Sequence, residues 1–200
     1  MGSALHLAHV SARQAMSEQN IFLIGMMAVG KSTVGRQLAL ALDLPFYDSD
    51  HEIERRAGAE IAWIFDVEGE SGFRNREEQI IDELSRKSGI VMATGGGVVV
   101  RDINRQRLAE RGLVVHLDGS IDKLLRRTRR DRKRPLLQGP KPAKTLRDLA
   151  EHRAPLYREI ADYRVNTDRR SASSVAKQIV KRYRDPANEN YGVDDAERGG

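Results

Sequence analysis

Residues 21–33 read Ile-Phe-Leu-Ile-Gly-Met-Met-Ala-Val-Gly-Lys-Ser-Thr, and this stretch decides the fold. Its first four residues form an apolar run typical of a buried strand. Residues 25–33 match the G-x-x-x-x-G-K-[ST] pattern of the P-loop, and an amphipathic helical pattern follows. In that context the loop N–H groups bind phosphate oxygens, aided by the helix N-terminus. The stretch therefore predicts nucleoside triphosphate binding, rather than a glycine turn with an incidental lysine.

The loop residues have separate predicted tasks. We expect Lys31 to reach the β- and γ-phosphates of the nucleotide, and the Ser32 hydroxyl to ligate Mg²⁺. The residues of the loop that we expect to contact ATP are Ala28, Val29, Gly30, Lys31, Ser32 and Thr33.

Length and composition indicate one domain with peripheral ends. The chain has 200 residues, no cysteine and a formal charge of +5. We expect a flexible N-terminal extension over 1–18, a P-loop domain over 19–184 and a disordered tail over 185–200. With no signal-peptide core and no stretch able to span a bilayer, the sequence predicts a cytoplasmic protein without a membrane partner.

A basic run occupies residues 126–134, where seven of nine side chains are Arg or Lys. Such a run can bind nucleic acid, form a solvated helix end or gather the phosphates of a small nucleotide. On charge alone a solvated face ranks first. Beside a P-loop, we expect the run and the Pro- and Gly-containing segment after it to form a mobile lid over about 128–142.

Apolar runs and amphipathic stretches alternate along the chain. Strands are expected at 21–24, 45–47, 90–93, 113–117 and 163–165, with helical stretches between them. This alternation predicts an α/β fold of three layers, α/β/α, with a central parallel sheet of five strands. Ligands bind such sheets beyond the carboxyl ends of the strands. The P-loop, Asp48-Ser-Asp50 and Gly95-Gly-Gly97 follow strands, so they should converge at one edge.

Two aspartates at this edge have a functional and a structural interpretation. In an extended segment Asp48 and Asp50 point the same way, so both carboxylates can face the cleft. Phosphoryl transfer needs an acid near Mg²⁺ and often another to orient the attacking hydroxyl. Alternatively, Asp48 or Ser49 is the N-cap of the following helix. Next to a P-loop, we favour the functional interpretation.

Three further features are ambiguous on their own. Gly95-Gly96-Gly97 permits either close backbone approach to a ligand or a flexible turn. Arg74, near the start of a helix, suits an anionic ligand or a salt bridge to an acid such as Glu70. Arg153 lies in a helical stretch that Pro155 should kink or end, and without other context it would be a surface arginine.

Taken in order, these motifs resemble those of shikimate kinase. The resemblance rests on residues 25–33, Asp48-x-Asp50, Phe65-x-x-x-Gly-Glu-x-x-Phe-Arg74, Gly95-Gly-Gly97, Arg134-Pro-Leu-Leu and Arg153-x-Pro-Leu-Tyr157, and it spans about 20–183. It implies a P-loop kinase that transfers the ATP γ-phosphoryl group to the 3-hydroxyl of shikimate, in the route to chorismate. It also implies ATP and shikimate as ligands, one Mg²⁺ per subunit and, by analogy, a monomer that binds no nucleic acid.

The resemblance also implies a role for each matched residue. On the acceptor side, Asp50 holds the ring hydroxyls and accepts a proton, Arg74 and Arg153 clamp the carboxylate, and Gly95, Gly96 and Gly97 contact shikimate. On the nucleotide side, Lys31 and the lid residue Arg134 reach the phosphates, and Asp48 supports the Mg²⁺ that Ser32 ligates. Arg127 and Arg170 flank adenine, although Ala172 stands where a proline is often found in the adenine loop.

Two alternatives differ from this reading. A gluconate or nucleoside monophosphate kinase shares the P-loop and the lid, but has no reason to combine Arg74, Gly95–Gly97 and Arg153. A nucleotide-dependent RNA-binding module would use residues 126–134, but that run lacks interleaved aromatic residues.

Overall fold

A computed structural model describes residues 19–128 and 141–185 of the chain. Its centre is a five-stranded sheet with the strand order β2-β3-β1-β4-β5, in which every neighbouring pair is parallel. The predicted α/β fold with a central five-stranded parallel sheet is therefore confirmed. The strands are β1 (Asn20–Ile24), β2 (Phe46–Asp48), β3 (Val91–Ala93), β4 (Gly112–Asp118) and β5 (Tyr163–Asn166).

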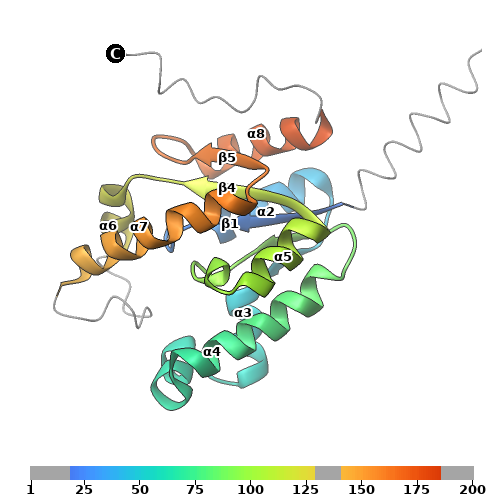
Figure 1. The fold of residues 1–200 in the computed structure, drawn as a ribbon. Coiled ribbons are helices and arrows are strands. Elements are labelled where there is room, and N and C mark those ends of the chain that lie inside the picture. The colour runs from blue at the N-terminus through green and yellow to red at the C-terminus, as the bar shows by residue number, and fades with distance from the viewer. Residues whose placement is uncertain (1–18, 129–140, 186–200) are drawn as a thin grey trace, which may run out of the picture.

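Helices cover both faces of this sheet (Figure 1). Helices α2 and α8 pack against each other on one face, and α5 and α7 pack on the other, with α4 beside α5. Because both faces are covered, the central strands are mostly apolar, and all of β1 is buried. The helices are α2 (Lys31–Leu42), α3 (Ser49–Ala57), α4 (Ile61–Ser85), α5 (Asp102–Arg111), α6 (Ile121–Thr128), α7 (Pro142–Ile160) and α8 (Ala172–Arg184), with a 3₁₀ turn η1 (Val98–Val100) before α5.

The end of β1 opposite the P-loop is held by one buried amide. The Asn20 side chain donates to the carbonyls of Ser85, Lys87 and Arg111, and accepts a hydrogen bond from Ile90 N–H. Asn20 thereby joins the ends of α4 and α5 to the segment that enters β3. Four hydrogen bonds on one side chain fix the strand that carries the P-loop at its other end.

Helix α4 consists of two helical stretches that meet at Gly69, where the backbone leaves helical geometry with φ 70° and ψ 179°. The sequence left open whether Pro155 kinks or ends its helix. Pro155 does not end α7, which continues to Ile160. A proline removes only its own N–H donor, and the carbonyl four residues earlier belongs to the exposed residue Glu151, where water can satisfy it.

Several expectations fall on residues outside the description. The N-terminal extension 1–18, the tail from 186 onward and the lid segment 129–140 with Arg134 lie outside the described residues. Within the described part of the chain, no helix is both long enough and apolar enough to cross a membrane.

Candidate functional site

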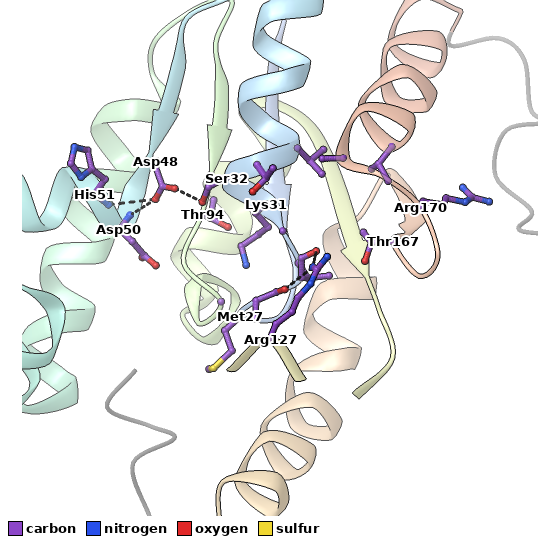
Figure 2. A pocket seen from close by; sticks show the side chains of 18 of the residues that line it. Met27, Lys31, Ser32, Asp48, Asp50, His51, Thr94, Arg127, Thr167 and Arg170 are labelled. Atoms are coloured by element: carbon purple, nitrogen blue, oxygen red, sulfur yellow. Dashed lines mark hydrogen bonds between the residues drawn. The ribbon is translucent and has the colours of Figure 1, made fainter. Parts of the chain in front are cut away.

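A cavity of about 660 Å³ lies at the carboxyl ends of the strands, where the predicted motifs meet (Figure 2). The P-loop, the end of β2, the start of α3 and the glycine segment after β3 all contribute to its wall. The predicted site residues that line it are Ala28, Val29, Gly30, Lys31, Ser32, Thr33, Asp48, Asp50, Gly96, Arg127 and Arg170. The rule that ligands bind beyond the carboxyl ends of the strands therefore correctly predicted that these segments, which are far apart in the sequence, meet at one edge of the sheet.

The P-loop wraps its own lysine. Ala28 and Gly30 have positive φ angles of 62° and 109°, which turn the backbone sharply before α2 begins. Lys31 is buried, and its Nζ donates to the carbonyls of Gly25 at 2.7 Å and Met26 at 3.0 Å. The ammonium group is thus positioned inside the loop, and Figure 2 shows it directed into the cavity. This arrangement places a cation where phosphate oxygens would enter.

The position of Asp48 is compatible with both of the interpretations that the sequence left as alternatives. Its Oδ1 accepts from the N–H groups of Asp50 and His51, so Asp48 is the N-cap of α3. Its Oδ2 accepts a 2.5 Å hydrogen bond from the Ser32 hydroxyl on α2. A hydroxyl and a carboxylate side by side form a donor set suited to a hard cation such as Mg²⁺, which needs only one or two protein ligands beside phosphates and water.

Asp50 reaches the cavity differently from the way the sequence argument assumed. It lies in the first turn of α3 rather than in an extended segment, because the strand ends at Asp48. Its side chain nevertheless faces the cavity and the glycine segment. A Cβ placed on Gly95 would lie 2.5 Å from Asp50 Oδ1 and 2.9 Å from Glu77 Oε1. Gly95 therefore leaves room for two carboxylates.

Arg74 is buried in α4 and fits both of its predicted interpretations. Its guanidinium donates to Glu77 at 2.7 Å and to Glu70 at 3.1 Å, so the expected salt bridge exists. Burial disfavours its charged form, but the two glutamates outweigh this and raise its pKa, so Arg74 stays a cation. Burial also raises the pKa of Glu77, which contact with Arg74 opposes. The guanidinium packs against Gly97 at the edge of the site.

Arg153 is not the surface arginine that its local sequence suggested. Only 3% of Arg153 is exposed, and its Nη1 donates to the Gly96 carbonyl at 3.1 Å. The Tyr157 hydroxyl, one helical turn further along α7, donates to the same carbonyl at 2.5 Å. Helix α7 thus contributes an arginine and a tyrosine to the glycine segment.

Each of the three successive glycines faces a different neighbour. A Cβ on Gly95 would meet the Asp50 carboxylate, and one on Gly96 would lie 2.9 Å from Met27 N of the P-loop. A Cβ on Gly97 would lie 2.2 Å from Arg74 Nη2. Close packing, rather than a flexible turn, therefore accounts for all three positions.

Two arginines lie at the nucleotide end of the cavity. Arg127 of α6 donates from Nη1 to the carbonyls of Ala28 and Val29, at 2.9 and 3.0 Å. Arg170 lines the cavity, but its guanidinium extends outward and donates to Gln178 of α8 at 2.6 Å (Figure 2). Arg127 is therefore already in contact with the P-loop, whereas Arg170 is turned away from it.

Some lining residues were not predicted. They include Met27, Val34, His51, Glu54, Thr94, Thr167, Ala172 and Val175. Glu54 is four residues after Asp50 on α3, so helical spacing identifies it once α3 is known to begin at Ser49. Thr94 and Thr167 directly follow β3 and β5, so the strand-end rule that selected the glycines also identifies them. Val175 comes from packing of α8 that no local pattern reveals.

Comparison with known proteins gives one consistent family. The family model described as shikimate kinase matches residues 27–184. A protein of Alteromonas mediterranea named shikimate kinase is 59% identical over 165 residues, covering 82% of this chain and 96% of its own length. An Enterobacter protein named shikimate kinase 1 is 58% identical over 164 residues, covering 82% of this chain and 95% of its own.

Solved structures give the same result. A shikimate kinase from Acinetobacter baumannii, solved in complex with shikimate, has a TM-score of 0.82 and 47% identity, covering 85% of this chain and 95% of that one. A gluconokinase from Sinorhizobium meliloti has a TM-score of 0.57 at 18% identity, covering 88% of this chain and 97% of that one, and shares the fold alone.

Proposed function

This chain belongs to the shikimate kinase family, and we propose from that premise how its own residues carry out the reaction. The enzyme is an ATP-dependent kinase that transfers the γ-phosphoryl group of ATP to the 3-hydroxyl of shikimate. The products are shikimate 3-phosphate and ADP. The O–H bond of the acceptor breaks, a new O–P bond forms, and the bond between the γ-phosphorus and the bridging oxygen breaks.

One observation carries the assignment of the acceptor site. Two buried arginines, Arg74 from α4 and Arg153 from α7, converge on the Gly96–Gly97 peptide beside the P-loop cavity. A monoanionic polyol needs forked cations for its carboxylate more than it needs apolar surface. This arrangement supports binding of the shikimate carboxylate between the two guanidinium groups, and favours an acceptor that carries a carboxylate over a neutral sugar.

Asp50 is the group proposed to orient the attacking hydroxyl. It enters the cavity from the first turn of α3, directly across from Gly95. A carboxylate within reach of an acceptor hydroxyl can hold the O–H bond in line and take its proton as the O–P bond forms. Gly95, Gly96 and Gly97 present backbone to the same ligand. The bare backbone lets the acceptor approach closely.

Lys31 is the group proposed to neutralise charge on the transferred phosphoryl group. Phosphoryl transfer depends mainly on positioning and electrostatic stabilisation, and a buried ammonium inside the P-loop supplies both. We propose that Arg127 and Arg170 flank the adenine and that Arg134 acts on the phosphates from the lid. The contact of Arg127 with the loop carbonyls supports its placement at the nucleotide end.

Ser32 and Asp48 are the residues proposed to hold one Mg²⁺ with ATP. Among the described residues no group of three or more His, Cys, Asp or Glu side chains is arranged to hold a metal, which fits an ion bound largely through phosphates and water. When bound, Mg²⁺ neutralises phosphate charge. We also propose that the enzyme is a cytoplasmic monomer whose domain spans residues 19–184.

The test is shikimate-dependent release of ADP by the full chain with ATP and Mg²⁺. Arg153→Ala should raise the KM for shikimate by two orders of magnitude or more while the Kd for ATP stays within twofold, since a charged contact is lost. Arg158→Ala is a matched control, because Arg158 is an exposed arginine on the same helix. ADP release that does not depend on shikimate would refute the function. Tight, salt-sensitive RNA binding would instead favour the RNA-binding alternative.

A further inference from the structure

We propose that Tyr157 is a positioning residue for shikimate, which holds the Gly96–Gly97 peptide in place between the two arginines of the acceptor site. The inference rests on the proposed function, because it explains how the carboxylate-binding arginines are set at a fixed separation. It concerns a residue of α7 that does not itself line the cavity.

The first step is the contact between α7 and the glycine segment. The Tyr157 hydroxyl and Arg153 Nη1 both donate to the Gly96 carbonyl, at 2.5 and 3.1 Å. The two residues are four apart, so they lie on the same face of the helix. Burial raises the pKa of Tyr157, so its hydroxyl remains a donor at all physiological pH values. Two donors from one helix therefore fix a single carbonyl oxygen.

The second step links this carbonyl to Arg74 on the opposite side. The peptide unit from Gly96 to Gly97 is planar, so the Gly96 oxygen and the Gly97 Cα move as one body. The Arg74 guanidinium packs directly on Gly97, since a Cβ there would lie 2.2 to 2.5 Å from three of its atoms. The peptide is consequently held by α7 at one end and supports Arg74 at the other. Its position sets the distance between Arg74 and Arg153.

The third step is that the tyrosine itself cannot swing away. Its ring stacks on His116 of β4, with centroids 4.9 Å apart and planes at 23°. Its hydroxyl also lies 3.6 Å from Met26 Sδ at the start of the P-loop. Both the ring and its partner are buried, at 1% and 6% exposure. The tyrosine is therefore held in place by β4 and by the start of the P-loop.

The tyrosine also leaves Arg153 available for its ligand. A guanidinium has five N–H donors in a fixed fork, and Arg153 uses Nη1 to bind the Gly96 carbonyl. If Arg153 were the only donor to that oxygen, movement of its side chain toward a carboxylate would release the peptide. With Tyr157 present, the carbonyl keeps a neutral donor while Arg153 engages substrate.

The first experiment compares Tyr157→Phe with Tyr183→Phe in the full chain. Tyr183 of α8 is the matched control. It is also a buried tyrosine, and its hydroxyl donates to a backbone carbonyl, that of Gln19, outside the proposed acceptor site. We expect Tyr157→Phe to raise the KM for shikimate about tenfold, the factor that one hydrogen bond provides, with the Kd for ATP within twofold of wild type. Tyr183→Phe should change neither constant. Equal shikimate KM values in both variants would overturn the proposal.

Two further measurements separate positioning from general stability. Site-specific 4-aminophenylalanine at position 157 keeps a donor at the ring end, and should restore the shikimate KM to within about threefold of wild type. In ligand-free wild type, the amides of Val98 and Val100, which donate to Gly95 and Gly97, should exchange slowly with deuterium. Failed rescue, or exchange that becomes slow only with shikimate, would contradict a preformed segment. Loss of the proposed function is distinguishable, because wild type itself would then release no shikimate-dependent ADP.

Discussion

Acidification should destabilise this protein through His116. The side chain is buried on β4, and burial lowers its pKa to about 4, with Asp118 opposing the shift. Its Nδ1 has no hydrogen-bond partner in the described structure, so no hydrogen bond at that atom stabilises a buried imidazolium. The other charged groups that act on it are Arg164, Lys31 and Arg158, and all three disfavour its charged form.

The magnitude follows from linkage between protonation and folding. In the unfolded chain the imidazole has its ordinary pKa of 6.5, whereas in the folded protein its pKa is about 4. Between these two pH values the unfolded state therefore binds a proton that the folded state does not bind. The stabilisation is complete above pH 6.5 and is lost as the pH falls from 6.5 to 4. At about 1.4 kcal/mol per pKa unit, His116 costs about 2 kcal/mol of unfolding free energy at pH 5 and about 3 kcal/mol in the limit.

Urea unfolding followed by far-ultraviolet circular dichroism at pH 7.5 and pH 5.0 measures this loss. Other groups titrate as well, so the informative quantity is the difference between wild type and His116→Phe, which keeps a ring to stack on Tyr157. The variant should lose about 2 kcal/mol less than wild type over this interval. His152→Gln, at an exposed histidine of α7, should behave as wild type. The reasoning is refuted if wild type and His116→Phe lose the same free energy.

Four other perturbations have defined outcomes. Gly97→Ala should push aside the Arg74 guanidinium and raise the shikimate KM at least tenfold with an unchanged Kd for ATP; equal losses of both affinities by calorimetry would contradict this. Lys31→Ala should lower kcat more than a hundredfold without lowering Tm, and near-normal kcat would argue against the P-loop assignment. Asn20→Ala should cost about 3 kcal/mol of unfolding free energy at unchanged kcat/KM, because four hydrogen bonds are lost; a cost below about 1 kcal/mol in urea would be inconsistent. Chelation with EDTA should abolish ADP release, and excess Mg²⁺ should restore it; activity that survives chelation would exclude the metal requirement.

Local sequence patterns were sufficient to predict the architecture and the residues that line the nucleotide half of the cavity. The apolar run before Gly25, the loop itself and the amphipathic stretch after it identify strand, P-loop and helix, and alternation gives the parallel sheet. The rule that ligands bind beyond strand ends then placed Asp48, Asp50 and Gly96 at one edge. These inferences depend on spacing along the chain, which the sequence contains in full.

Tertiary contacts account for what local pattern missed. Arg153 looks like a surface residue until α7 is packed on the glycine segment, and Pro155 looks like a helix end until the exposure of its partner carbonyl is known. Arg74 could not be assigned to a salt bridge from the sequence alone, because its partners Glu70 and Glu77 both lie within one helical turn and local spacing does not show which contacts form. The hydroxyl of Tyr157 meets Gly96 across 61 positions of sequence, and no local pattern encodes that contact.

The three glycines after β3 also affect how resistance to an inhibitor of this site could arise. Each added methyl group would collide with a different neighbour: a carboxylate, the P-loop backbone or a guanidinium. A compound that draws its affinity from the main chain here contacts atoms that every amino acid shares. A substitution at these positions that prevents inhibitor binding would also inactivate the enzyme. Resistance would therefore have to arise outside these three positions.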